Sequence, residues 1–320
     1  MQAKPRAVFL DFATAGPGME TAPLDALVEK TYFAYSTPAQ MPARLEACEI
    51  AILNKAKLDA GTIATAEQLK LIVLAATGTD NVDTLAARER GVAVANIRDY
   101  CSAAVAQHVC AMLMELTQHV GRYDALVKAG AWQRSKIFAL FDYPIRELDG
   151  RNLGIVGYGS LGQAVAAMGR GLGMKVLVSA RPKSAQAPAG RVPFDAVLEQ
   201  ADVLSLHCPL TEETQHLIGA AELKRMKSDA ILINTARGAL VDGAALSEAL
   251  RNGVIGGAGI DVLPVEPPAE SHPLLAGDIP NLILTPHIAW AAKESRQRAL
   301  DQVAENIADF LRGGRLRRVV

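Results

Sequence analysis

Short hydrophobic runs alternate with amphipathic segments along most of the chain. Short hydrophobic runs separated by helical segments are typical of parallel strands in a sheet covered on both faces. In the first part of the chain, strands are predicted at 7–12, 31–35, 49–55, 69–76 and 91–97, and helices at 23–30, 39–47 and 60–68. In the second part, strands are predicted at 152–157, 174–180, 201–209, 230–236, 256–262 and 281–287, with helices between them. The pattern therefore predicts an α/β protein with two doubly wound parallel sheets.

A long apolar segment at residues 102–118 separates the two series of strands. It predicts one helix with Ser102 as its N-cap. His108 lies on this helix, where we expect its side chain to pack against neighbouring residues or to act as a cap. A long helix after a complete α/β series indicates a crossing into a second domain, and a final amphipathic helix at 291–312 is expected to return to the first. We therefore expect one domain of residues 1–98 and 291–320 and a second of residues 99–290.

Composition and charge exclude several classes of protein. Half of the 320 residues are hydrophobic and 21% are charged, which is typical of a globular protein. The 33 basic and 34 acidic residues leave a net charge of −1, so the basic excess of a nucleic-acid-binding protein is absent. No stretch has the pattern of a signal peptide or a membrane helix. The four cysteines are far apart and form no metal-binding motif, so we expect reduced thiols, no metal site and a cytoplasmic protein.

A glycine-rich turn follows the first strand of the second series. Gly157, Gly159 and Gly162 match the pattern G-x-G-x-x-G, with an apolar strand before them and a helix after them. Glycines at this spacing allow a tight turn and close approach of a pyrophosphate to the N-terminus of the helix. The alternative is a turn that only packs the strand on the helix. The context favours a dinucleotide site.

The position at which such sites carry an acid for the adenosine ribose is occupied by Ala180, followed by Arg181 and Lys183. A missing carboxylate beside a guanidinium suits a ribose that carries a 2′-phosphate. NADP is therefore predicted as the preferred cofactor. NAD remains the alternative, in which Arg181 is a surface residue and the pocket tolerates alanine.

Three further polar groups follow strands of the second series. Arg237, Glu266 and His287 come after the strands at 230–236, 256–262 and 281–287. Ligands of open α/β sheets bind where the strands end. Arginine offers a bidentate fork to a carboxylate, and a glutamate beside a histidine fixes its tautomer and favours its protonated form. Together these groups predict a site that binds a carboxylate and moves a proton, although each alone is more often a solvated side chain.

Five segments in this order and spacing resemble the signatures of the D-isomer-specific 2-hydroxyacid dehydrogenases: GYGSLG, HCPLTEET, NTARG, DVLPVEP and TPHIAW. The resemblance covers essentially the whole chain and is strongest to the glycerate dehydrogenase, or hydroxypyruvate and glyoxylate reductase, branch. It implies that residues 1–98 and 291–320 form a flavodoxin-like substrate domain, and that residues 99–290 form a Rossmann domain. It also implies an active site in the cleft between these domains.

The resemblance assigns a role to each candidate residue. Arg237 would clamp the substrate carboxylate and carbonyl, His287 would be the general acid/base, Glu266 its partner, and Asp261 would hold the nicotinamide carboxamide. The substrate contacts that it implies are Asn54, Lys55, Ala76, Thr77, Gly78 and Trp290. The cofactor contacts that it implies are Gly157, Gly159, Ser160, Leu161, Gly162, Ala180, Arg181, His207, Cys208, Pro209, Thr214, Thr235, Ala236 and Asp261.

The predicted function is hydride transfer between a nicotinamide cofactor and a small 2-oxo or 2-hydroxy acid. Formate dehydrogenases have the same fold but carry glutamine where Glu266 stands, which argues against that activity. The alternative from another class is a dinucleotide-sensing, corepressor-like binding protein with little turnover. A homodimer is expected through residues 102–118 and the aromatic loop at 132–141, for which a buried core is the competing interpretation. No nucleic-acid or membrane partner is expected.

Overall fold

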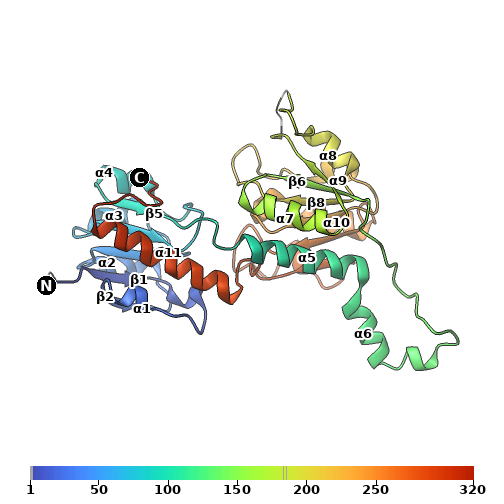
Figure 1. Cartoon of the computed structure of the whole chain (residues 1–320), viewed down its shortest axis with the longest axis horizontal. Coiled ribbons are helices and arrows are strands. Elements are labelled where there is room, and N and C mark those ends of the chain that lie inside the picture. The colour runs from blue at the N-terminus through green and yellow to red at the C-terminus, as the bar shows by residue number, and fades with distance from the viewer. Residues whose placement is uncertain (1–2, 183, 185) are drawn as a thin grey trace. The chain divides into compact units, whose positions relative to one another are not determined.

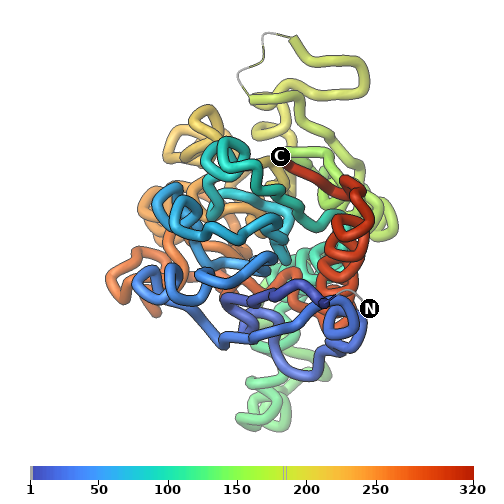
Figure 2. The backbone as a smooth tube through the Cα atoms, turned by 90° about the vertical axis from the view of Figure 1, so that its left-hand side faces the viewer, coloured from blue at the N-terminus to red at the C-terminus, as the bar shows by residue number. Residues whose placement is uncertain are grey.

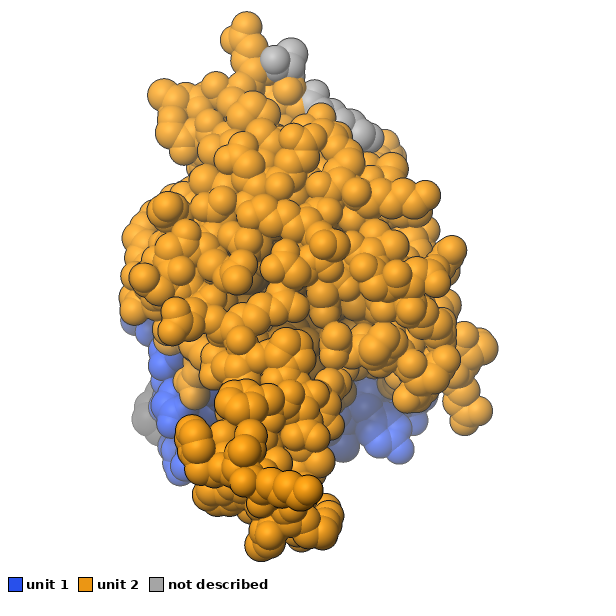
Figure 3. Space-filling model, turned by 90° about the vertical axis from the view of Figure 1, so that its right-hand side faces the viewer, with its two compact units in different colours: residues 1–101, 291–320 blue, residues 102–290 orange. Residues whose placement is uncertain are grey.

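The computed structural model describes residues 3–182, 184 and 186–320, and the chain divides into two compact units. Unit 1 comprises residues 1–101 and 291–320, and unit 2 comprises residues 102–290 (Figure 3). Each unit contains one parallel sheet with flanking helices (Figure 1), which confirms the predicted fold class. Lys183, which the sequence placed beside the adenosine ribose, lies outside the described residues.

The sheet of unit 1 has five parallel strands in the order β2-β1-β3-β4-β5, the flavodoxin-like order. The strands are β1 Arg6–Phe9, β2 Glu29–Tyr32, β3 Ile50–Leu53, β4 Leu71–Leu74 and β5 Ala93–Ala95. Every residue of β3 and β4 is buried, whereas β2 at the edge is largely exposed. The uninterrupted hydrophobic runs therefore mark the strands that helices cover on both faces.

The helices of unit 1 are α1 Ala22–Asp25, α2 Met41–Leu45, α3 Ala60–Thr65, α4 Thr84–Glu89 and α11 Lys293–Leu311. The helix predicted at 23–30 is wrong in its second half, because Glu29 and Lys30 pair with β1 as part of β2. Helix α4 was not predicted. It begins after Asp83, whose carboxylate accepts a 2.9 Å hydrogen bond from the amide of Ala86 as an N-cap.

Helix α11 lies against unit 1 and contacts α1 and β4 (Figures 1 and 2). The side-chain amide of Asn306 donates a 2.8 Å hydrogen bond to the carbonyl of Asn96. Beyond the helix, Arg318 forms an antiparallel bridge with Ala95. The last 30 residues thus complete the unit that β1 begins.

The sheet of unit 2 has six parallel strands, as the sequence predicts, and their order is β11-β10-β9-β8-β6-β7. They are β6 Asn152–Val156, β7 Lys175–Val178, β8 Val203–Leu206, β9 Ile231–Asn234, β10 Gly257–Ile260 and β11 Leu282–Leu284. The chain runs from β6 to β7 on one side, pairs Val192 with Ser179 there, and crosses to β8 on the other side. The strand order therefore reverses between β6 and β8, and the carboxyl ends of strands at such a point are where open α/β sheets bind ligands.

The helices of unit 2 are α5 Ser102–Gln118, α6 Val120–Lys128, α7 Ser160–Gly171, α8 Phe194–Gln200, α9 Ala220–Arg225 and α10 Gly243–Arg251. Helix α5 has the predicted bounds, but the predicted N-cap is wrong. Ser102 lies in the first turn and not before it, and its buried hydroxyl has no hydrogen-bond partner among the described residues.

Residues 119–147 form an arm of unit 2, which projects from the end of α5 (Figure 1). It begins at His119, whose φ of 52° ends α5 and turns the chain into α6, a helix that was not predicted. Trp132, Phe138 and Phe141 on the arm have exposed fractions of 52%, 89% and 76%. These aromatic side chains therefore do not belong to a core of this chain, which excludes the competing interpretation of the loop.

Candidate active site

The glycine-rich turn joins β6 to α7 and packs directly against the turn that follows β8. Gly157 has a φ of 92°, and a Cβ atom there would lie 2.5 Å from the backbone of His207 and Cys208. A Cβ atom on Gly162 would collide with the carbonyl of Gly157, whereas one on Gly159 would meet nothing within 4 Å. Two glycines are thus required by close packing, and the third borders open space in front of Ser160 and the N-terminus of α7. This is the arrangement that receives a pyrophosphate.

The turn after β8 is fixed by a hydrogen bond to β6 and by others within the turn. The amide of His207 donates to the carbonyl of Val156 at 2.7 Å. The Thr214 hydroxyl donates to the carbonyl of Pro209 at 2.8 Å and accepts from the amide of Thr211 at 2.7 Å. This network fixes residues 209–214 beside the glycine-rich turn.

His207 and Cys208 at this turn are both uncharged at neutral pH. Burial lowers the pKa of His207 to about 4 and raises the pKa of the Cys208 thiol to about 11. His207 Nε2 bonds the hydroxyl of Ser205 at 2.8 Å, but its Nδ1 is buried and has no partner among the described residues. A neutral histidine with an unsatisfied ring nitrogen therefore lies where the strand order reverses.

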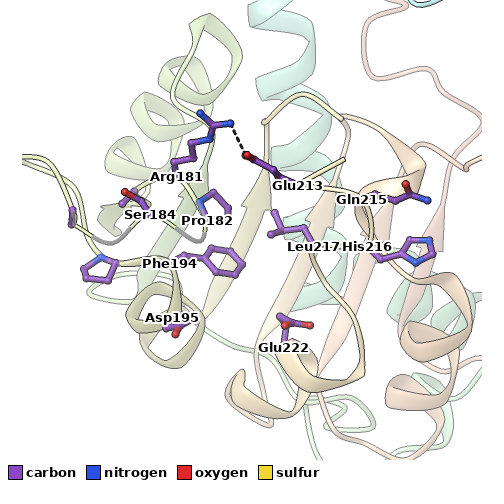
Figure 4. Close-up of a pocket in the computed structure, with 13 residues that line it drawn as sticks. Arg181, Pro182, Ser184, Phe194, Asp195, Glu213, Gln215, His216, Leu217 and Glu222 are labelled. Carbon is purple, nitrogen blue, oxygen red and sulfur yellow. Dashed lines mark hydrogen bonds and ion pairs between the residues drawn. The ribbon is translucent and has the colours of Figure 1, made fainter. Parts of the chain in front are cut away.

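A cavity of about 410 Å³ lies between the end of β7 and the loop after β8 (Figure 4). Ala180 and Arg181 line one side, and Glu213 and Leu217 line the other. The Arg181 guanidinium donates to the Glu213 carboxylate at 2.5 Å, across the cavity. Ala180 is 5% exposed and lines the cavity with a methyl group alone.

The turn after β9 carries Arg237. Asn234 fixes it by donating to the carbonyl of Arg237 at 2.9 Å and accepting from the amide of Ala236 at 3.0 Å. Thr235 Oγ1 is buried without a partner among the described residues. A Cβ atom on Gly238 would collide with the backbone of Leu263, so this turn packs against the loop after β10.

His287 and Glu266 form a direct pair. Their Nδ1 and Oε2 atoms lie 2.6 Å apart, and the other carboxylate oxygen of Glu266 accepts from the amide of Leu263 at 2.9 Å. The side chains are 24% and 33% exposed, so the pair is reachable from solvent. Trp290 donates from its indole to the carbonyl of His287 at 3.0 Å. With Nδ1 held by the carboxylate, Nε2 is the nitrogen that remains for a substrate.

Asp261 fixes the backbone of His287 and of the residues that follow it, a contact that the sequence did not indicate. His287 has a φ of 56°, and its amide donates to the carbonyl of Asp261 at 2.7 Å. The buried carboxylate of Asp261 accepts from the amides of Ile288 and Ala289, both at 2.9 Å, and from the hydroxyl of Thr285 at 2.6 Å. Both carboxylate oxygens are therefore committed to the His287 loop.

His108 reaches the same network from helix α5. Its Nε2 lies 3.1 Å from the hydroxyl of Thr285 and 3.6 Å from a carboxylate oxygen of Asp261. The sequence assigned this histidine to packing or capping. Its hydrogen bond to Thr285 adds a polar contact to the loop, which no spacing pattern revealed.

The substrate candidates of unit 1 follow β3 and β4. The carboxylate of Asp11 accepts from the amides of Asn54, Lys55 and Ala56 at 2.6–3.2 Å, so a residue that was not predicted fixes this loop. The loop at 76–78 is tied down as well, because Ile97 and Asn96 donate to the carbonyls of residues 76 and 77 at 3.2 and 2.7 Å. Trp290 belongs to unit 2, with the other two sets of candidates.

The residues of unit 2 fit a dinucleotide on structural grounds. Open space lies at Gly159, and the unsatisfied atoms Nδ1 of His207 and Oγ1 of Thr235 are at carboxyl ends of strands in the same sheet. Buried polar groups without partners are rare in folded proteins, and a bound ligand or an ordered water satisfies most of them. No group of three or more metal-binding side chains occurs among the described residues. Within the same part of the chain, every helix is too short or too polar to span a bilayer.

Comparisons with known proteins agree with this geometry. Residues 110–289 match the family model described as D-isomer specific 2-hydroxyacid dehydrogenase, NAD binding domain. A glycerate dehydrogenase of Methylorubrum extorquens is 47% identical over 89% of both chains. A hydroxypyruvate reductase of Blautia hydrogenotrophica is 36% identical over 96% of this chain and 97% of its own. Among solved structures, an acyclic imino acid reductase in complex with NADPH and D-Arg has a TM-score of 0.86 and 25% identity, with 98% of this chain and all of the other covered.

Proposed function

Because the chain belongs to the D-isomer specific 2-hydroxyacid dehydrogenases, a family of NAD(P)-dependent oxidoreductases, we propose that it reduces hydroxypyruvate or glyoxylate to the 2-hydroxy acid. The resemblance seen in the sequence is thereby confirmed at the level of the family. The observation that carries the proposal is the 2.6 Å contact between His287 and Glu266, which follow β11 and β10 of the sheet that also carries the glycine-rich turn. Relatives named glycerate dehydrogenase, hydroxypyruvate reductase and glyoxylate reductase support this choice of substrates.

His287 is the proposed proton donor. When bound, the nicotinamide supplies the hydride that reaches the carbonyl carbon of the substrate. Nε2 of His287 gives its proton to the carbonyl oxygen, so the C=O double bond becomes a hydroxyl, and solvent returns a proton to the imidazole. Glu266 holds Nδ1 and offsets the positive charge of the imidazolium before transfer.

Arg237 is the proposed clamp for the substrate carboxylate and carbonyl. Its guanidinium offers two parallel hydrogen bonds, and its backbone is fixed by Asn234. We assign carboxylate binding in unit 1 to the amides of residues 76–78, beside Asn54 and Lys55, and assign the wall of the pocket to Trp290. The order imposed by Asp11 on the 54–56 loop supports this role.

The dinucleotide is assigned to unit 2, with NADP as the preferred cofactor. Its pyrophosphate would lie on residues 157–162, its adenosine between Arg181 and residues 207–214, and its nicotinamide near residues 235–236 and Asp261. Small Ala180 beside the Arg181 guanidinium supports a 2′-phosphate. NADPH in the similar imino acid reductase structure also supports this preference.

We further propose a cytoplasmic homodimer that pairs through α5 and the arm. Exposed aromatic rings such as Phe138 and Phe141 are rarely left uncovered in clusters on a monomer. Four free cysteines support a reducing compartment. Light scattering of the wild-type protein and of Phe138→Ser tests the dimer, since loss of this ring should weaken the association.

One assay separates the enzyme from the alternative of a dinucleotide-sensing binding protein. Absorbance at the nicotinamide band is followed with a panel of 2-oxo acids and with both reduced cofactors. We expect rapid oxidation of NADPH with hydroxypyruvate or glyoxylate, at least about tenfold more efficiently than of NADH. Tight dinucleotide binding with no turnover on any 2-oxo acid would instead favour the binding protein.

A further inference from the structure

The cavity between β7 and the loop after β8 holds an ion pair that the proposed function does not use. Arg181 from the end of β7 donates to Glu213 from the opposite loop at 2.5 Å (Figure 4). The two side chains are 73% and 56% exposed, so solvent screens the pair and a competing anion can reach it. The guanidinium assigned to a 2′-phosphate is therefore already bound to a carboxylate.

Glu213 is the acid of this cavity that faces Arg181. The other two carboxylates lining the cavity have partners elsewhere: Asp195 pairs with Arg225 at 3.0 Å, and Glu222 accepts from the amide of Gly219 at 3.0 Å. The neighbouring Thr214 fixes the backbone beside Glu213 through its bond to Pro209. The carboxylate is thus presented to Arg181 by an ordered turn.

We propose that Glu213 is a specificity-determining residue that weakens binding of a 2′-phosphate. This inference rests on the proposed binding of a dinucleotide in unit 2 with Arg181 beside the adenosine ribose. A 2′-phosphate must displace Glu213 from the guanidinium and then lies near a like charge. The uncharged ribose hydroxyls of NAD meet neither obstacle. Glu213 therefore supplies, from across the cavity, the negative charge that position 180 lacks, and it moderates the preference for NADP that Arg181 creates.

The test compares two probes that differ only in the phosphate. Dissociation constants of adenosine 2′,5′-bisphosphate and of 5′-AMP are measured by calorimetry, which requires no turnover. Glu213→Gln should tighten the bisphosphate about tenfold and change 5′-AMP less than about twofold, because only the former carries charge at the 2′ position. Glu212→Gln, which removes the adjacent exposed acid, is the matched control and should change neither probe. Thermal unfolding verifies that each variant is folded.

The variants also separate this inference from the function on which it rests. Arg181→Ala should weaken the bisphosphate selectively, and adding Glu213→Gln to that variant should then recover less than about threefold. If Arg181→Ala has its expected effect but Glu213→Gln alone leaves the bisphosphate unchanged or weaker, the role of Glu213 is wrong and the NADP site stands. A full tenfold gain in the absence of Arg181 also contradicts it, since Glu213 would then not act through that pairing. If neither substitution changes the ratio of the two probes, both the NADP site and the role of Glu213 are wrong.

Discussion

Asp261 and His287 are joined through the backbone, with the amide of His287 donating to the carbonyl of Asp261 at 2.7 Å. The carboxylate of Asp261 then accepts the next two amides, so one buried side chain fixes the loop in which His287 has a positive φ. A non-glycine residue in this region of φ is held there only when its surroundings determine it. We therefore regard Asp261 as a positioning residue for His287, in addition to its proposed contact with the nicotinamide.

Asp261→Asn tests this positioning role. Asparagine has an NH2 group in place of one carboxylate oxygen. This group would point its hydrogens at a backbone amide or at a hydroxyl that now donates to the carboxylate. We therefore expect a loss of about 1–3 kcal/mol in the free energy of unfolding. The rate constant kcat should fall together with it, while affinity for 5′-AMP should be unchanged because the proposed adenosine site, beside Arg181 after β7, is separate from the Asp261 loop. Urea unfolding, steady-state kinetics and calorimetry measure these three quantities. A variant of wild-type stability would show that the loop does not depend on this carboxylate.

Glu266→Gln tests the coupling between Glu266 and His287. The carboxylate lies 2.6 Å from Nδ1, so it holds the imidazole ring and leaves Nε2 for the substrate. Glutamine keeps the shape of the side chain but not its charge, so kcat for reduction should fall, whereas the affinity for NADPH should be nearly unchanged. Single-turnover oxidation of NADPH by both proteins is the measurement, and equal rates would show that the two residues are not coupled.

Much of this fold follows from local pattern. The hydrophobic runs of β3, β4 and β8–β10 are buried throughout, and helix α5 has no charge before Glu115 to interrupt it, so both kinds of element could be recognised. Helix α4 was not recognised although α3 and α9 also have six residues, and the signal that marks it is the N-cap Asp83. The shortened α1 reflects pairing of Glu29 and Lys30 with β1, a contact between segments that no local signal encodes.

The residues of the candidate site also include some that could be identified from the sequence and some that could not. Glycine spacing and the Arg, Glu and His at strand ends could be identified because the chemistry depends on residue type. Asp11 and His108 could not, because they act by holding loops that are distant in sequence. The partner of Arg181 was also invisible, since Glu213 meets it only when the end of β7 and the loop after β8 lie side by side.

Arg237→Lys tests the clamp. A lysine ammonium is a point charge and cannot form two parallel hydrogen bonds to a carboxylate, so kcat/KM for the 2-oxo acid should fall by about 10²-fold or more. The affinity for NADPH should be nearly unchanged, which serves as the internal control. Wild-type efficiency in this variant would mean that the substrate anion binds elsewhere.

His207 gives a prediction about stability. Burial lowers its pKa from 6.5 to about 4, so between these values the unfolded chain binds a proton that the folded chain does not. Stability that is present above pH 6.5 is therefore lost as the pH falls towards 4, by up to about 3 kcal/mol. His207→Gln, which can keep the bond to Ser205, should remove this part of the acid sensitivity. Urea unfolding at about pH 7.5 and about pH 4.5 compares the two proteins, and equal losses would refute the assignment.

The proposed function depends above all on proton donation by His287 in the reduction of a 2-oxo acid. The most direct measurement is the single-turnover rate of NADPH oxidation with glyoxylate or hydroxypyruvate, for the wild-type protein and for His287→Gln. We predict rapid oxidation by the wild type and a decrease of at least about 10²-fold in the variant, with little change in the dissociation constant of NADPH. A variant that oxidises NADPH at nearly the wild-type rate would show that His287 is not the proton donor.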